Sequence, residues 1–140
     1  MSSRTDIANG QVTARSYVLC VAGEFSYDDF TSGTGLAFCT LPVGAIVTGG
    51  DLRVTTNWNS GTTAGMEIGD SATAARYLSA ENLLAAGDEY AALVPTGFEV
   101  TSATDQILLE VTETGTAATA GVGNLVVLYV DPTKHDENFE

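Results

Sequence analysis

Short hydrophobic runs separated by turn residues recur along the whole chain. Alternating apolar and polar positions are typical of half-buried β-strands, and Gly and Pro clusters between such runs are typical of turns. The pattern therefore predicts an all-β domain, either an antiparallel β-sandwich or a jelly-roll-like barrel. The predicted strands are 16–22, 34–40, 45–48, 51–58, 65–68, 91–94, 99–100, 107–114 and 124–130, with Gly49 and Gly50 as one of the turns.

One segment departs from the β pattern. Residues 72–86 are rich in Ala and Leu and are followed by Gly87. Good helix formers that end at a glycine cap favour a helix. We therefore expect one short helix or 3₁₀ segment near residues 79–86, crossing one end of the sandwich. A longer helix over the whole stretch is the alternative.

The last predicted strand is apolar on both of its faces. Strand 51–58 alternates in the ordinary way, but residues 125–130 are apolar at every position, and residues 17–22 resemble them. Side chains leave a strand on opposite sides in turn, so such a run needs cover on both sides. The domain core supplies one cover, and a neighbouring subunit or a packed loop supplies the other. The subunit interpretation predicts these contact residues: Tyr17, Leu19, Trp58, Val126, Leu128 and Val130.

Trp58 has three interpretations. It falls in register with Leu52 and Val54, which favours a side chain that caps the core or anchors a subunit contact. Because Asn57 and Asn59 flank it, an exposed Trp58 could instead form a platform for a carbohydrate ring. This last interpretation defines the alternative function, a carbohydrate-binding or host-surface-binding module.

Length and charge narrow the class of protein. A chain of 140 residues suits one domain, here 15–130, with a flexible polar N-terminal arm at 1–14 and an acidic tail at 131–140. Eighteen acidic residues against five basic ones give a net charge of −13, which disfavours nucleic acid and anionic membranes as partners. No apolar stretch follows the N-terminus as in a secretory signal, so we expect synthesis in the cytoplasm.

The sequence offers little for chemistry. The single histidine, His135, lies in the charged tail, and no nucleophile motif is present, so we expect no catalytic residues and no cofactor. Asp51, Asp70 and Asp88 occupy turn-like positions, where solvated acids are favoured over calcium ligands, and we expect no metal site. Cys20 and Cys39 lie in apolar runs, which favours two buried free thiols over a disulfide between paired strands.

Several phrases of the sequence resemble a known family. They are LPVGAIVTGGDL at 41–52, NWNS at 57–60, IGD at 68–70, RYL at 76–78 and GTAATAG at 115–121, the last leading into residues 125–129. In layout they resemble tailed-bacteriophage virion proteins of the capsid decoration, or cement, and head-fibre type. The resemblance covers roughly residues 41–130.

The resemblance implies a non-enzymatic structural role. Proteins of this type bind the outside of the capsid as oligomers and stabilise the shell by cementing neighbouring subunits. The implied partners are further copies of the chain, most simply in a homotrimer, and the major capsid protein. The implied location is the capsid exterior of the virion.

Overall fold

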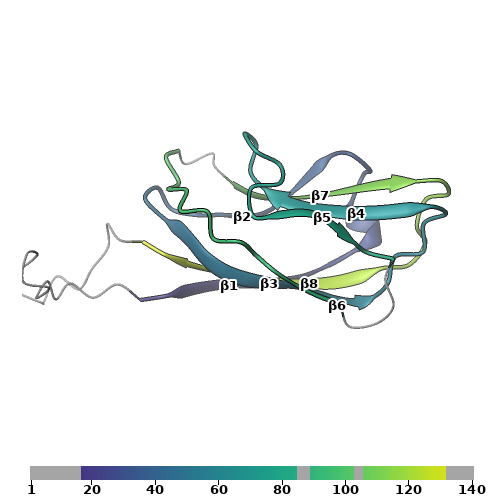
Figure 1. Ribbon diagram of the computed structural model, residues 1–140, viewed down its shortest axis with the longest axis horizontal. Coiled ribbons are helices and arrows are strands. Elements are labelled where there is room, and N and C mark those ends of the chain that lie inside the picture. Colours follow the sequence, from purple (N-terminus) through teal and green to yellow (C-terminus); the bar gives the residue numbers. More distant parts are fainter. Residues whose placement is uncertain (1–16, 85–88, 103–105, 132–140) are drawn as a thin grey trace, which may run out of the picture.

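The computed structural model describes residues 17–84, 89–102 and 106–131 and shows a β-sandwich of eight strands (Figure 1). A single 3₁₀ turn, η1, occurs in these ranges. In chain order the elements are β1 (Leu19–Ser26), η1 (Tyr27–Asp29), β2 (Gly35–Thr40), β3 (Ile46–Thr56), β4 (Thr63–Gly69), β5 (Leu78–Asn82), β6 (Glu89–Ala92), β7 (Gln106–Thr114) and β8 (Val122–Val130). The prediction of an all-β sandwich is confirmed.

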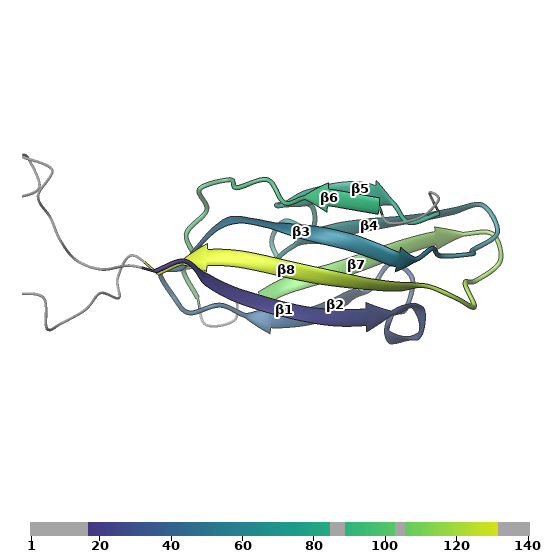
Figure 2. The same cartoon turned by 90° about the horizontal axis from the view of Figure 1, so that it is seen from below.

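The strands form two four-stranded sheets that pack face to face. The first sheet has the order β1-β8-β3-β6 and the second has the order β2-β7-β4-β5, and the strand pairs in both are antiparallel. This alternation of the chain between two sheets is the jelly-roll arrangement of two Greek keys. Figure 2 shows that the start of β1 and the end of β8 lie at the same end of the sandwich, which we call the terminal end.

The core lies between the sheets and follows the predicted alternation. The buried residues of the first sheet include Leu52 and Val54 on β3 and Leu125 and Val127 on β8. Arg53, between Leu52 and Val54 in the sequence, is exposed on the opposite face of β3. On the second sheet the buried set is Ala64, Met66, Ile68, Ile107, Leu109 and Val111. Burial of this apolar area stabilises the fold by roughly 25 cal/mol per Å².

An aromatic cluster closes the core at the end opposite the termini. The rings of Phe25 and Phe30 meet edge to face at 5.6 Å between centroids, and Phe25 lies 6.1 Å from Trp58. Gly121 and Gly123 pass directly beneath these rings: a Cβ on Gly121 would lie 2.5 Å from Cδ2 of Trp58. The cluster therefore depends on backbone without side chains at the start of β8.

The predicted turn at Gly49 and Gly50 is wrong. Both residues lie inside β3, which continues from Ile46 to Thr56. The register against β8 shifts between Val47 and Gly49, which marks a β-bulge. Gly50 has a φ of 139°, and a Cβ there would lie 2.1 Å from the carbonyl oxygen of Val126. The glycines thus permit a bulge and a close strand approach rather than a reversal of the chain.

The predicted helical segment near 79–86 is also wrong where the structure describes it. Residues Leu78–Asn82 form β5, which pairs with β4, and residues 85–86 lie outside the described ranges. A helix this short is not stable from propensity alone, whereas the open edge of β4 offers hydrogen bonds. The other predicted segments correspond to strands, except that 99–100 contributes only an isolated bridge between Ile46 and Glu99.

Candidate interaction surface

The last strand, β8, has one covered face and one open face. Leu125 and Val127 point into the core and are fully buried, whereas Val126, Leu128 and Val130 lie on the opposite side and are half-buried. None of the described elements packs over that outer side, because the second sheet lies on the inner side (Figure 1). The structure therefore places apolar side chains of a central strand on an outward face.

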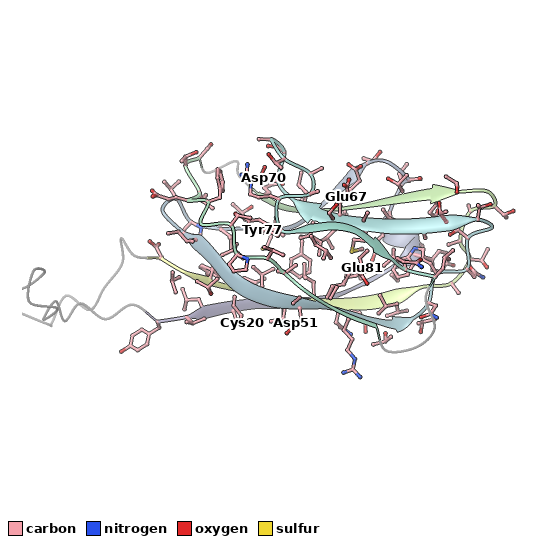
Figure 3. All side chains as sticks on the ribbon, viewed as in Figure 1. Cys20, Asp51, Glu67, Asp70, Tyr77 and Glu81 are labelled. Carbon is pink, nitrogen blue, oxygen red and sulfur yellow. The ribbon has the colours of Figure 1, made fainter. Side chains whose placement is uncertain are left out.

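Neighbouring strands extend this apolar area. Across the β1–β8 ladder, Cys20 is registered with Leu128 and Ala22 with Val126, and both Cys20 and Ala22 are exposed. Figure 3 shows Cys20 pointing away from the second sheet. We call the resulting surface the apolar strip; it consists of Val18, Cys20, Ala22, Val126, Leu128 and Val130.

The other half of the same sheet face is polar. Asn124 on β8 is registered with Glu24 on β1 and with Arg53 on β3, and Asp51 follows beside Val126. These side chains border a shallow hollow of about 550 Å³. The outer face of the first sheet therefore combines an uncharged strip near the terminal end with a charged region farther along the strands.

Only some of the predicted contact residues lie on the same face of the first sheet. Val126, Leu128 and Val130 share the outer face. Tyr17 and Leu19 are 65% and 44% exposed, but Leu19 is registered with Tyr129, which places it on the inner side of β1, at the terminal end. All of these except Trp58 have accessible side chains in the single chain.

Trp58 lies in the core rather than on the surface. Its side chain is 2% exposed and packs in the aromatic cluster. Both a carbohydrate platform and a subunit contact need an exposed ring, so the core-capping interpretation is the one that agrees with the structure. The amide of Asn59, next in sequence, instead joins the loop before β8, since its Oδ1 accepts hydrogen bonds from the N–H groups of Thr119 and Ala120.

The two cysteines are free thiols in different environments. Cys39 on β2 is partly buried, and burial raises the pKa of its thiol to about 11. Cys20 is exposed on β1 within the apolar strip. The prediction of free thiols is confirmed, but the prediction that both are buried is wrong for Cys20. The apolar run at 17–22 does not by itself show that the face of β1 carrying Cys20 lies on the surface.

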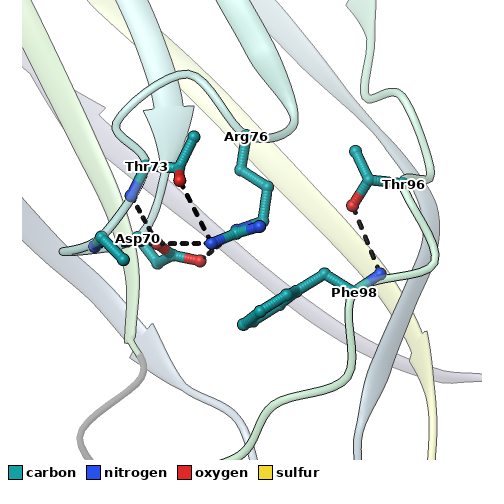
Figure 4. Close-up of polar contacts among 6 residues, drawn as sticks. Asp70, Thr73, Arg76, Thr96 and Phe98 are labelled. Atoms are coloured by element: carbon teal, nitrogen blue, oxygen red, sulfur yellow. Dashed lines mark hydrogen bonds and ion pairs between the residues drawn. The ribbon is translucent and has the colours of Figure 1, made fainter.

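At the terminal end a buried carboxylate fixes the loop after β4. Asp70 is 5% exposed and accepts hydrogen bonds from the backbone N–H groups of Ala72 and Thr73 at 3.0 and 2.8 Å. The guanidinium of Arg76 pairs with the same carboxylate and lies over the ring of Phe98 (Figure 4). Burial raises the pKa of Asp70, but the hydrogen bonds from Arg76, Thr73 and Ala72 outweigh it, and the pKa lies below its usual value.

Of the turn acids considered as calcium ligands, the two that the structure describes, Asp51 and Asp70, lie apart, on β3 of the first sheet and just after β4 of the second. Asp70 is engaged by Arg76, Asp51 lies on the outer face of the first sheet, and Asp88 is outside the described ranges. Within those ranges, no three His, Cys, Asp or Glu side chains are grouped so that they could hold a metal ion. In the same part of the chain, no helix has the length and apolar character that a membrane crossing requires.

Three solved structures of similar fold are chains of phage capsids. The sequence matches no protein-family model, and the comparison with curated proteins finds no match. A chain of the cyanophage Pam1 capsid asymmetric unit matches with a TM-score of 0.68 and 26% identity, over 84% of this chain and 86% of that one. A chain of the acid-stable capsid of Helicobacter pylori bacteriophage KHP30 matches with a TM-score of 0.58 and 21% identity, over 86% and 94%.

A third neighbour is a chain of the capsid of Ralstonia phage GP4, with a TM-score of 0.52 and 18% identity over 82% of this chain and 86% of that one. The chains from KHP30 and GP4 share the fold with this protein. The coverage values are similar on both sides, so these neighbours have about the same length as this chain.

Proposed function

We propose that this chain is a non-enzymatic structural protein of a phage virion, and that it decorates the outside of the capsid as a homo-oligomer that stabilises the shell. Its similarity to a chain of similar length in a phage capsid asymmetric unit supports a virion role. The decoration role is our inference from the surface described above. The major capsid protein is the proposed partner, and the homotrimer is the proposed oligomer.

The apolar strip is the observation that carries this proposal. The chain has a net charge of −13, yet the strip holds six uncharged side chains, five of them on the adjacent strands β1 and β8 and Val18 just before β1. An exposed apolar area is typical of an interaction site, and we assign this one to a protein interface. The polar half of the same sheet face, with Arg53, Glu24 and Asp51, would supply the specificity at the rim of that interface.

Decoration would stabilise a shell by simple thermodynamics. A chain that binds two neighbouring capsid subunits at once must be released before they separate, so its binding free energy adds to theirs. Several copies held in one oligomer bind together, which multiplies modest individual affinities. Contacts of moderate size are therefore sufficient, and no chemical step is needed.

The proposal is tested with particles of the source phage that lack this chain. Purified protein is added to the particles, binding is measured by co-sedimentation, and particle disruption is followed on heating. We expect saturable binding and a higher disruption temperature. Folded wild-type protein that does not sediment with the particles would overturn the decoration role.

Two matched variants test the apolar strip. Leu128→Asp places a charge in the strip, and Thr112→Asp places the same charge at an exposed position on β7 of the second sheet. We expect Leu128→Asp to weaken capsid binding at least tenfold, and Thr112→Asp to bind like the wild type. Circular dichroism checks that both variants are folded. Equal binding by the two variants would remove the strip from the interface.

Light scattering tests the oligomer separately. A homotrimer has three times the 14.5 kDa mass of one chain, and we expect this mass for the free protein or for the form eluted from particles after cross-linking. A monomer in both measurements would overturn the trimer and leave the capsid-binding test unaffected.

A further inference from the structure

The four edge strands of the sandwich differ in how they are protected. Unpaired edges invite pairing with another chain, and proteins avoid this with short strands, bulges, prolines or charges. β6 spans only four residues and β5 only five. β2 has a register shift between Ala37 and Cys39. Each of these three edges therefore carries a recognisable protective feature.

The β1 edge is neither short nor bulged, and it carries a single charged residue. Its eight residues pair with β8 in an unbroken register from Leu19 to Ser26. It contains no proline, lysine or arginine, and Glu24 is its single charge. Its hydrogen-bonded neighbour in the described sheet is β8 alone. The side chains at its start are well exposed, with Val18 at 60% and Leu19 at 44%. The β1 edge is thus the open pairing site of the described fold.

We propose that the β1 edge of one copy is extended by the N-terminal segment of another copy, with residues 11–15 as the added strand. This segment reads Gln-Val-Thr-Ala-Arg, an alternation of polar and apolar residues that suits a strand. A strand added in this way gains its affinity from main-chain hydrogen bonds. It would also lie beside Cys20 and Ala22 and enlarge the apolar area next to the strip.

Length and charge favour this occupant. Sixteen residues precede Tyr17, and an extended chain rises about 3.3 Å per residue, so half of them would span the eight-residue edge. Those sixteen residues contain two of the five basic residues of the chain, Arg4 and Arg15, and one of its eighteen acidic residues. They would meet a folded body that is strongly acidic, with the exposed Glu24 on the edge itself.

The residues just before β1 favour pairing of the N-terminal segment with another copy over pairing with its own β1. To fold back onto its own β1, the segment would have to reverse direction immediately before Leu19. Residues 14–18 are Ala, Arg, Ser, Tyr and Val, none of which favours a tight hairpin turn. The Asn9-Gly10 pair, which does favour such a turn, lies too early in the chain for this purpose. Continuation onto a neighbouring copy needs no turn.

A cysteine scan of the full-length chain tests the proposal. Single cysteines replace Gln11, Val12, Thr13, Ala14 and Arg15 in turn, and mild oxidation captures any pairing with the exposed native Cys20. Neighbouring strands place facing Cα atoms within the 4.4–6.8 Å range that a disulfide requires. Residues one position away point to the other face, and residues two positions away lie about 7–8 Å from Cys20, beyond disulfide range. We therefore expect an inter-chain disulfide at one position of the scan and little at the others.

The controls separate strand pairing from collision and from pairing within one chain. Cys20→Ser in the same background should abolish the cross-links, and Thr116→Cys, on an exposed loop at the far end, should give none. Uniform cross-linking along the scan, intra-chain disulfides alone, or cross-links that survive Cys20→Ser would each overturn the proposal. The inference rests on the proposed homo-oligomer but not on the capsid. Capsid binding without a preferred disulfide position would therefore refute this pairing and leave the decoration role intact.

Discussion

Glu67 on β4 stands directly opposite Glu110 on β7. Both side chains are partly exposed, and Figure 3 shows Glu67 pointing away from the first sheet. Like charges that face each other across neighbouring strands destabilise the pair. The outer face of the second sheet thus places two carboxylates opposite each other, whereas the apolar strip lies on the outer face of the first sheet. The two faces of the sandwich are therefore chemically different.

Glu67→Lys should raise the free energy of unfolding. The substitution replaces repulsion with attraction across the ladder, and we expect a gain of about 0.2–1 kcal/mol at low ionic strength. The measurement is urea unfolding, with Glu99→Lys as a control that changes the net charge equally at an exposed site. The gain should shrink in 0.5 M salt because of screening. An equal gain in Glu99→Lys would attribute the effect to net charge rather than to the pair.

Asp70→Asn should lower stability at neutral pH and flatten its dependence on acid pH. The ionised carboxylate accepts the Arg76 and backbone hydrogen bonds, and charge-assisted bonds contribute about 1.5–3 kcal/mol. Its folded-state pKa lies below the ordinary value of 3.8. The stabilisation is therefore complete above the unfolded-state pKa and is lost as the pH falls through the folded-state pKa.

Thermal unfolding between pH 7 and pH 2 checks this prediction. The difference between wild type and Asp70→Asn should be largest near pH 7 and should narrow in the most acidic buffers. Arg76→Met, which keeps an unbranched chain near the ring of Phe98, should show a similar loss at pH 7. A difference that is constant across the whole range would assign the loss to packing instead of charge.

Gly123→Ala should destabilise the sandwich, whereas Gly65→Ala should not. A Cβ on Gly123 would lie 2.6 Å from the ring of Phe25, and a Cβ on Gly65 would have its nearest neighbour at 3.9 Å. Overpacking of a rigid ring costs about 1–3 kcal/mol, while alanine in an open strand position tends to stabilise. Chemical denaturation of both variants measures the contrast. Equal stability would show that Phe25 can move without cost.

The sequence predicted the fold class because alternation and turn glycines act locally and recur along the chain. Strand β3 shows this, since Leu52 and Val54 are buried and Arg53 is exposed as expected. The prediction of a helix near 79–86 failed because strand pairing there depends on distant residues. Helix propensity is a local preference, but the pairing of Leu78–Asn82 with β4 depends on an edge that only the folded sheet provides. The predicted turn at Gly49 and Gly50 was wrong for a similar reason, since a glycine pair permits a β-bulge within a strand as well as a turn.

The outward apolar face of β8 was predictable in part, whereas its role as a contact surface stays a prediction. Apolarity on both faces of the strand singled out Val126, Leu128 and Val130, because it is visible in the sequence of a single strand. The contribution of Cys20 and Ala22 depends on the register between β1 and β8, which links residues about a hundred positions apart. Trp58 was ambiguous because an apolar position near the end of a strand can close the core or extend beyond it. Its 2% exposure resolves that ambiguity.

The two thiols should differ sharply in reactivity. Iodoacetamide reacts with the thiolate, and the raised pKa of Cys39, about 11 against the ordinary 9.0, lowers its thiolate fraction at pH 8 about a hundredfold. Partial burial slows the reagent further. We expect mass spectrometry to show one rapid modification at the exposed Cys20 and a slow second one at Cys39. In denaturant Cys39 should react at the rate of an ordinary thiol, and equal rates in native and denatured protein would contradict the burial of Cys39.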